Sequence, residues 1–257
     1  MTQLLVARDV SELAARAEQW LTELIRGHQA SNSTPFSLAL AGGSTPKALY
    51  QRLAASSKSS GIDWNRVLFL WGDERNVPAV HPDSNYRMVR ESLLDKLEVD
   101  NQSIDRIPTE GGDEAQVGQV ALQYEIKLTQ RLLVNSHGMG VIDCVLLGMG
   151  DDVHTASLFP ETTALHEASR WVVANYVPKL NTWRVTLTAP LINAAKQVAF
   201  FIAGSSKGPA LNTLWHGPHQ PELYPSQMIQ PSPGELTYFV DKPAIGNLAI
   251  PSNFRML

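Results

Sequence analysis

Short apolar runs alternate with longer stretches of helical period along most of this chain, and that alternation constrains the fold more than any other feature. The runs typical of strands fall at residues 36–41, 66–71, 104–107, 142–147, 171–177, 183–187 and 198–202. The stretches typical of helices fall at 11–26, 46–55, 84–96, 114–134 and 208–216. Strands this uniformly apolar are buried on both faces, as parallel strands are. The pattern therefore predicts a three-layer α/β/α fold around a mostly parallel, Rossmann-like sheet.

The domain organisation follows from the lack of a clear linker in the sequence. The segment 218–234 is irregular and rich in proline, and residues 236–240 are predicted to form a late strand at the edge of the sheet. A chain of 257 residues is long enough to bury a large core without disulfides or metals. We therefore expect one α/β domain that spans residues 1–257.

Composition and charge exclude several classes of protein. The net charge is −4 and no block of basic residues occurs, which argues against a nucleic-acid-binding surface. The one cysteine, Cys144, excludes a disulfide framework and a thiolate metal cluster. The sequence shows neither a secretory signal pattern nor an apolar run of the ~18 residues that a membrane helix needs. These features predict a cytoplasmic protein that holds any anionic ligand with a few well-placed cations.

Two glycine-rich loops of similar sequence each follow a predicted strand and open a helix, at the edge of the sheet where ligands bind in folds of this kind. The first loop, 42–46, opens a helix, so it is either an ordinary capped turn or an anion site built from backbone N–H groups and hydroxyls. The second loop, 203–208, echoes the first when Gly204 is aligned with Gly42. With Lys207 added, the two loops would offer a phosphate both N–H donors and a point charge.

Charged residues follow the second strand and interrupt a later one. Glu74 and Arg75 come directly after the apolar run 67–71. Glu74 is predicted to be a solvated strand end, whereas Arg75 is predicted to bind an anion at the crevice. Arg184 alternates with apolar residues in the predicted strand 183–187. It is therefore either a charge on an edge strand or a second contact to an anion or hydroxyl.

The strongest local signal is a histidine beside two carboxylates in the glycine-rich loop after the central strand. Asp151 and Asp152 precede His154 there. An adjacent carboxylate orients an imidazole and raises its basicity, which suits a general base near neutral pH. The pattern leaves open which carboxylate makes this contact, and a lone histidine is more often structural. The spacing matches neither a zinc site nor an EF-hand, so no metal is expected.

In their order along the chain, these motifs resemble the 6-phosphogluconolactonases of the pentose phosphate pathway. The matching stretches are Ala-Gly-Gly-Ser-Thr-Pro at 41–46, Gly-Asp-Glu-Arg at 72–75, Ser-Asn-Tyr at 84–86, Gly-Met-Gly at 148–150, His-Thr-Ala-Ser-Leu-Phe-Pro at 154–160, Pro-Lys at 178–179, Arg-Val-Thr-Leu-Thr at 184–188 and Gly-Ser-Ser-Lys at 204–207. One such stretch alone would say little, but the ordered set is specific. The resemblance implies the fold shared by glucosamine-6-phosphate deaminases and ribose-5-phosphate isomerases.

The resemblance also implies an activity and a role for each site residue. It implies hydrolysis of 6-phosphoglucono-1,5-lactone to 6-phosphogluconate without a metal or organic cofactor. The expected partner is a small sugar phosphate, and a monomer is expected although the sequence does not determine the oligomeric state. His154 would be the general base that activates water, with Asp152 beside it. The residues expected at the phosphate are Gly43, Ser44, Thr45, Arg75 and Lys207. The residues expected at the sugar acid are Asn85, Lys179 and Arg184.

One residue departs from the family's pattern. The family usually has Asp-Gly-His where this chain has Asp152-Val153-His154. If the backbone requires a positive φ at this position, a β-branched valine is strained or moves the loop. If φ is negative, Val153 merely fills space. The sequence leaves both conformations open.

Two other functions remain as alternatives. A sugar-phosphate isomerase or deaminase would use the same fold, but the deaminases that this chain resembles place a glutamate for proton transfer where Phe159 stands. A non-catalytic phosphosugar-binding protein would carry similar site residues. Repressors of that kind have a DNA-binding module ahead of the fold, whereas here the first predicted strand already begins at Phe36.

Overall fold

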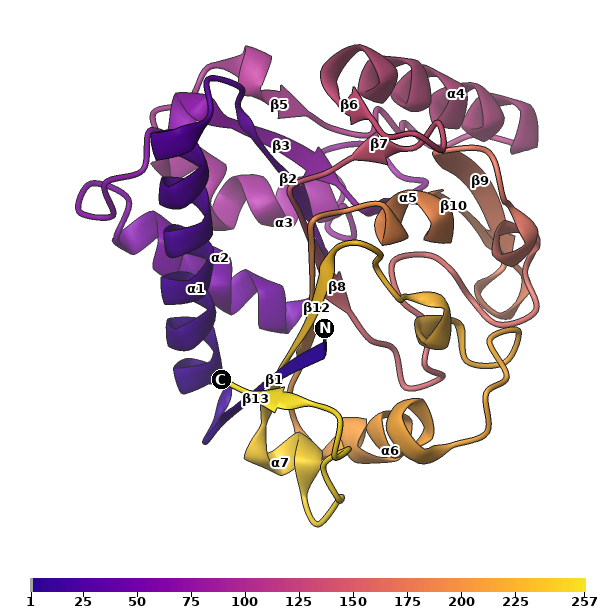
Figure 1. Ribbon diagram of the computed structural model, residues 1–257. Coiled ribbons are helices and arrows are strands. Elements are labelled where there is room, and N and C mark those ends of the chain that lie inside the picture. Colours follow the sequence, from indigo (N-terminus) through magenta and orange to yellow (C-terminus); the bar gives the residue numbers. More distant parts are fainter. Residues whose placement is uncertain (1) are drawn as a thin grey trace.

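The computed structural model describes residues 2–257, and an eight-stranded sheet forms its centre (Figure 1). The strands of this main sheet are β1 (Thr2–Ala7), β2 (Phe36–Leu40), β3 (Val67–Trp71), β5 (Ile104–Asp105), β8 (Cys144–Gly148), β11 (Gln197–Ile202), β12 (Glu235–Asp241) and β13 (Arg255–Met256). They lie in the order β13-β1-β12-β11-β8-β2-β3-β5, and their pairings are parallel. The predicted mostly parallel sheet is confirmed.

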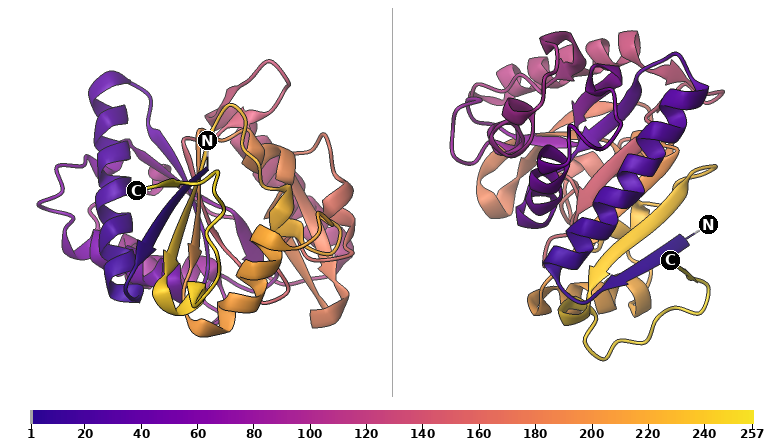
Figure 2. Two further views of the ribbon diagram at one scale, coloured as in Figure 1. Left: turned by 60° about the horizontal axis from the view of Figure 1, so that its bottom comes forward. Right: turned by 90° about the vertical axis from the view of Figure 1, so that its left-hand side faces the viewer.

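Helices and a second sheet cover the two faces of the main sheet (Figures 1 and 2). The helices are α1 (Val10–Ser31), α2 (Ser44–Ala55), α3 (Asn85–Ser92), α4 (Glu114–Arg131), α5 (Ala189–Asn193), α6 (Gly208–His216) and α7 (Lys242–Ile245). α1 and α2 pack on one face. α1 begins where the Asp9 side chain accepts a hydrogen bond from the Glu12 N–H, and it buries a stripe that includes Leu13 and Leu21. The helix layer thus follows from local capping and apolar periodicity.

A small antiparallel sheet lies on the opposite face. Its strands are β4 (Asp73–Arg75), β10 (Thr182–Leu187) and β9 (Val172–Val177), in that order, and α4 packs against β9 and β10. A two-stranded hairpin of β6 (Leu133–Val134) and β7 (Gly140–Val141) follows α4. The strands predicted at 171–177 and 183–187 are therefore confirmed, but they belong to this second sheet instead of the main one.

Several elements of the structure differ from those predicted from the sequence. The prediction that residues 236–240 form an edge strand is wrong, because β12 lies between β11 and β1. The short apolar run of β1 did not predict a strand. In the structure β1 pairs with the outer side of β12, and β13 pairs with the outer side of β1 (Figure 2). The helix predicted over 84–96 ends at Ser92 and gives way to a 3₁₀ turn, Leu94–Lys96. The segment 218–234 is irregular as expected, apart from a 3₁₀ turn at Pro225–Met228. Among residues 2–257, no helix is both long and apolar enough to cross a bilayer.

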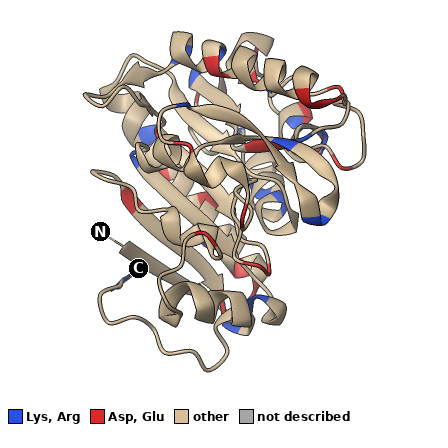
Figure 3. Cartoon of the chain, turned by 90° about the vertical axis from the view of Figure 1, so that its right-hand side faces the viewer, with Lys and Arg blue, Asp and Glu red and all other residues tan. Residues whose placement is uncertain are grey.

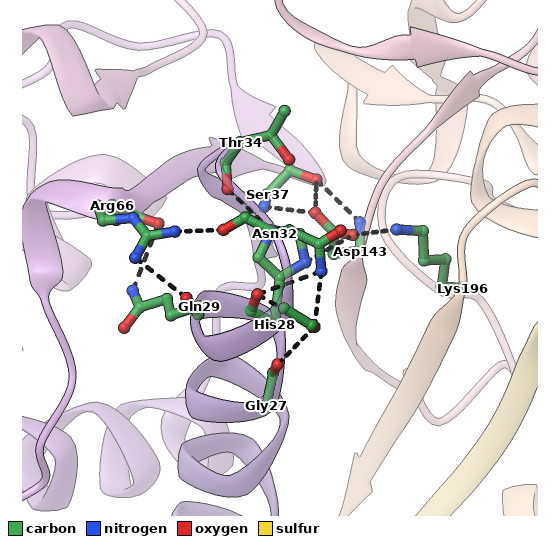
Figure 4. A network of polar contacts seen from close by, with 10 residues as sticks. Gly27, His28, Gln29, Asn32, Thr34, Ser37, Arg66, Asp143 and Lys196 are labelled. Atoms are coloured by element: carbon green, nitrogen blue, oxygen red, sulfur yellow. Dashed lines mark hydrogen bonds and ion pairs between the residues drawn. The ribbon is translucent and has the colours of Figure 1, made fainter.

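A polar network joins α1 to the amino ends of β2 and β8, at the end of the sheet away from the glycine-rich loops (Figure 4). Its centre is the buried carboxylate of Asp143. One oxygen accepts hydrogen bonds from the N–H and the hydroxyl of Ser37, both at 2.8 Å. The other lies 2.7 Å from Nζ of Lys196 and 3.6 Å from Nδ1 of His28. The network therefore ties a helix to two neighbouring strands through one charged group.

This network predicts an asymmetric response to mutation. Asp143→Ala leaves the buried Ser37 N–H without its acceptor, so we expect a loss of about 2–3 kcal/mol in the free energy of unfolding. Lys196→Ala is the matched control, because its side chain is 56% exposed and should cost less than about 1 kcal/mol. Chemical denaturation measures both. Equal costs for the two variants would contradict the central place of Asp143.

Candidate active site

A cleft of about 190 Å³ lies at the carboxyl ends of β2, β3 and β8. The glycine-rich stretches that follow these strands form its walls, together with the side chains of Asp73, Arg75, Asn85 and His154. This is the edge at which ligands bind in open parallel sheets. Of the predicted site residues, Gly43, Arg75, Asn85 and His154 line the cleft directly.

The two glycine-rich loops share a conformation. Gly43 has φ +99° and ψ 165° immediately before α2, and Gly204 has φ +94° and ψ 147° immediately before the 3₁₀ turn Ser205–Lys207. The structural correspondence therefore pairs Gly204 with Gly43, one residue away from the alignment with Gly42 suggested by the sequence. In both places the positive φ favours glycine. At α2 the loop presents the backbone N–H groups of a helix amino end, where Ser44 and Thr45 form the first turn.

Asn85 reaches the cleft because Gly42 lacks a side chain. A Cβ atom on Gly42 would lie 2.0 Å from Oδ1 of Asn85. The amide nitrogen of Asn85 donates to the backbone carbonyl of Asp73 at 2.9 Å and approaches the Asp73 carboxylate at 3.3 Å. The Asp73 carboxylate also accepts a hydrogen bond of 2.6 Å from the hydroxyl of Ser157. These contacts hold the β3–β4 corner against the start of α3 and against the loop that carries His154.

The imidazole of His154 is held on three sides. Its Nδ1 is hydrogen-bonded to Oδ1 of Asp152, and its ring stacks on Phe159 with centroids 3.9 Å apart. Gly150 lies behind the ring, where a Cβ atom would come within 2.0 Å of Nδ1. Because the carboxylate accepts a hydrogen bond from the Nδ1–H group, Nε2 is the nitrogen left to act on a ligand. The arrangement can therefore accept a proton in the cleft.

The two aspartates before His154 have different partners. Asp152 contacts His154 through one oxygen and Nζ of Lys179 through the other, at 2.5 Å. Partial burial raises the pKa of Asp152, but the hydrogen bonds from His154 and Lys179 outweigh it and hold that pKa well below its usual value. Asp151 is instead largely exposed and pairs with Nζ of Lys207 at 2.7 Å. Asp152 is thus the carboxylate that orients the histidine.

Val153 adopts the strained conformation of the two that the sequence left open. Its φ is +61°, and its side chain is buried. A β-branched residue in the left-handed region costs about 1–3 kcal/mol. Its N–H donates to the carbonyl of Gly150 at 3.1 Å. Its carbonyl accepts from the N–H and the hydroxyl of Ser226 at 2.9 and 2.7 Å. The surrounding contacts therefore hold the loop in place in spite of the valine.

Two arginines meet across the second sheet beside the cleft. Arg75 in β4 is the register partner of Arg184 in β10, and its guanidinium donates to the carbonyl of Asp83. Within residues 2–257, Nε and Nη1 of Arg184 are buried without a hydrogen-bond partner. Burial lowers the pKa of Arg184, while the nearby Asp73 carboxylate opposes that effect. Buried guanidinium N–H groups without partners are groups that an anionic or hydroxylated ligand can satisfy.

The prediction that Glu74 is a solvated strand end is wrong. The residue is 1% exposed. Its carboxylate accepts hydrogen bonds of 2.8 Å from the backbone N–H groups of Arg75, Asn85 and Tyr86, and one of 3.1 Å from the hydroxyl of Ser84. Burial raises the pKa of Glu74, and the three backbone donors oppose the rise. Glu74 therefore binds the amino end of α3 and positions Asn85.

Other residues that shape the site were not identified from the sequence. Asn175 and Ser226 are buried and contact the loop that carries His154 from distant parts of the chain. Asn175 in β9 donates to the carbonyl of Ser157 at 2.9 Å. No local sequence signal marks such contacts, because each depends on how separate elements pack. In the part of the chain that the structure describes, no three His, Cys, Asp or Glu side chains are arranged to hold a metal ion.

Comparison with known proteins gives consistent results. Residues 8–238 match the family described as glucosamine-6-phosphate isomerases/6-phosphogluconolactonase. The 6-phosphogluconolactonase of Synechocystis sp. is 41% identical over 82% of this chain and 84% of its own. That of Haemophilus influenzae is 35% identical over 82% of this chain and 87% of its own.

Solved structures show the same fold. The 6-phosphogluconolactonase from Trypanosoma brucei matches with a TM-score of 0.85 and 30% identity over 97% of this chain and 99% of its own. A monomeric glucosamine-6-phosphate deaminase matches with a TM-score of 0.75 at 18% identity, over 94% of this chain and 98% of its own. The latter likeness concerns the fold alone. The three-layer α/β architecture is therefore shared by both kinds of protein.

The packing of Gly150 against His154 predicts a sharp difference between two neighbouring glycines. Gly150→Ala should displace the imidazole, because the new Cβ would lie 2.0 Å from Nδ1 and 2.8 Å from Oδ1 of Asp152. Gly148→Ala is the matched control, since no heavy atom lies within 4 Å of a Cβ atom there. NMR spectra of protein labelled with ¹⁵N-histidine, with the His154 signal assigned by mutation, test this. An unmoved His154 signal in folded Gly150→Ala would contradict the packing.

Proposed function

This chain belongs to the glucosamine-6-phosphate isomerase/6-phosphogluconolactonase family, and we propose that it hydrolyses 6-phosphoglucono-1,5-lactone to 6-phosphogluconate. The curated relatives from Synechocystis sp. and Haemophilus influenzae both carry the name 6-phosphogluconolactonase. The observation that carries the proposal is the pair of His154 and Asp152 at a glycine-rich cleft beside lysine and arginine side chains. A lactone is an activated ester, so orientation and a general base are sufficient for its hydrolysis.

The phosphate of the substrate binds at the glycine-rich loops. Gly43, Ser44 and Thr45 offer the backbone N–H groups at the amino end of α2, and Arg75 and Lys207 supply positive charge. Lys207 is paired with Asp151 in this structure, and an incoming phosphate would exchange places with that exposed carboxylate. Binding energy from this remote group then holds the lactone ring near His154.

His154 performs the chemistry as a general base. Its Nε2 takes a proton from a water molecule while the oxygen of that water attacks the carbonyl carbon of the lactone. The bond from that carbon to the ring oxygen breaks, and the proton passes from the imidazolium to the leaving oxygen. Asp152 stays ionised and stabilises the imidazolium in between. Asn85, Lys179 and Arg184 contact the hydroxyls and the developing carboxylate of the sugar acid.

The environment of His154 disfavours the isomerase or deaminase alternative. Phe159 stacks on the imidazole at the position where the deaminases that this chain resembles have a glutamate. A phenyl ring cannot carry the proton transfers that opening and isomerising a sugar ring require. The non-catalytic alternative differs from the lactonase only in turnover, so the activity measurement below separates them.

We further propose that the chain acts as a single-domain monomer in the cytoplasm on a small-molecule substrate. The single domain is supported by the main sheet, in which β1 and β13 from opposite ends of the sequence pair with each other. Cys144 is a free and fully buried thiol, which is compatible with the reducing cytoplasm. Basic and acidic residues are interspersed over the second sheet and α4 instead of being gathered by sign, which does not favour a nucleic-acid partner (Figure 3).

Replacement of the base should abolish the reaction and spare binding. We expect His154→Ala to lower kcat by about 100- to 10,000-fold, the usual range for loss of a general base, with 6-phosphogluconate still bound. Lys207→Ala should instead raise KM, because the phosphate loses a charge partner. His137→Ala, in the exposed turn between β6 and β7, is the control. The rate is measured with lactone made in situ, after subtraction of spontaneous opening; a wild-type rate equal to that background would refute the function.

The acid side of the pH profile should show one protonation step. The hydrogen bonds from His154 and Lys179 hold the pKa of Asp152 well below its usual value, so its carboxylate stays ionised through the weakly acidic range and adds no protonation step of its own there. We therefore expect the logarithm of kcat/KM to fall with a slope of about one as the pH decreases. A limiting slope near two in the same range would show that Asp152 titrates there as well.

A further inference from the structure

The carbonyl group of Val153, the residue directly before His154, is held from a distant part of the chain. It accepts two hydrogen bonds from Ser226, one of 2.9 Å from the backbone N–H and one of 2.7 Å from the hydroxyl. Both residues are almost completely buried, with 1% of Ser226 and 2% of Val153 exposed. Ser226 belongs to the 3₁₀ turn Pro225–Met228, in the otherwise irregular segment 218–234.

The orientation of this carbonyl determines the orientation of the backbone N–H of His154. The carbonyl of Val153 and the N–H of His154 belong to one planar peptide group, so fixing the oxygen fixes the plane from which the histidine extends. Val153 has φ +61°. This conformation is unfavourable for a β-branched residue and persists only where other contacts hold it. Because the Val153 N–H is held on the carbonyl of Gly150, a change of φ that relieved the strain would turn the carbonyl of Val153 and break both hydrogen bonds from Ser226. The two bonds therefore oppose the motion that would misplace the imidazole.

The turn that carries Ser226 is itself braced. The side chain of Gln227 donates to the carbonyl of Pro218 at 3.1 Å and accepts from the N–H of Gln220 at 2.8 Å. The side chain of Asn193, at the end of α5, donates to the carbonyl of Met228 at 2.8 Å. The segment that shows no regular periodicity in the sequence is thus a fixed support under the loop that carries the base.

We propose that Ser226 is a positioning residue for the reaction: it holds the carbonyl of the strained residue Val153 so that the imidazole of His154 stays aligned for proton transfer. This inference rests on the proposed lactonase function. Among residues 2–257, Ser226 makes no hydrogen bond to Asp152 or to the phosphate loops, so its effect should appear in kcat and leave KM unchanged. It should also depend on the strain at Val153.

A double-mutant cycle with Val153 tests the proposal. Ser226→Ala should lower kcat about tenfold with KM changed less than about twofold, because a small misplacement of a reacting group can cost up to ~100-fold. In the Val153→Gly background, where glycine adopts the positive φ without strain, the same change should lower kcat by less than about threefold. Ser92→Ala is the matched control: Ser92 is also buried, and its hydroxyl donates to the carbonyl of Met88 in α3.

The outcomes separate positioning from a merely structural role. An unchanged kcat in Ser226→Ala, or an equal loss in both backgrounds, overturns the proposal. A fall in kcat that is matched by the Ser92→Ala control also overturns it, because general destabilisation would then explain the loss. If Ser226→Ala does not fold, Ser226→Cys takes its place in the cycle, since a thiol of similar size is only a weak donor.

A readout without turnover keeps this test independent of the lactonase proposal. In ¹⁵N-histidine NMR spectra, Ser226→Ala should shift the His154 signals and leave those of His28 unchanged, because His28 lies at the other end of the sheet. A moved His154 signal in a protein without lactonase activity would refute the function and support the positioning. An unmoved signal in an active protein would refute the positioning and support the function.

Discussion

The backbone of Gly72 makes one hydrogen bond to each of the two sheets, and the arrangement of the site depends on this junction. Its N–H donates to the carbonyl of Leu40 in the main sheet at 2.9 Å, while its carbonyl accepts from the N–H of Leu187 in the second sheet at 2.8 Å. The chain therefore leaves the main sheet at the end of β3 and enters the second sheet as β4. This step carries Arg75 to its partner Arg184 and brings Asp73 to Ser157. The same step buries Glu74, which the sequence pattern predicted to be solvated.

Charge at the site is balanced locally, although the whole chain is weakly acidic. Lys179 and Lys207 each pair with one of the two adjacent aspartates, so the cations are held in place before a ligand arrives. Arg184 is different, because two of its nitrogens are buried and have no partner within residues 2–257. An anionic or hydroxylated ligand can satisfy buried guanidinium nitrogens of this kind.

Strain and support occur together in the loop that carries His154. Val153 is one of several residues other than glycine with a positive φ in this region, with Ala156 and Glu161. Backbone strain of this kind persists where surrounding contacts over-determine the conformation. Here those contacts come from Ser226, from Asn175 through the carbonyl of Ser157, and from the Gly150 N–H that donates to the carbonyl of His154. Val153 therefore keeps a backbone conformation that costs about 1–3 kcal/mol, because these contacts hold the loop in place.

The sequence by itself determined the class of fold, most of the strands and helices, and the residue types at the carboxyl edge of the sheet. These follow from hydrophobic periodicity and from glycine, charge and hydroxyl patterns, which are local properties of the chain. Only the tertiary structure decided that Asp152, and not Asp151, holds His154, that Glu74 is buried under α3, and that Val153 has a positive φ. It also decided that Ser226, from a segment without periodicity, donates to the carbonyl of Val153 in the loop that carries His154. Each of these depends on loop conformation and on contacts between elements far apart in the sequence, and local residue patterns do not encode which distant groups will meet.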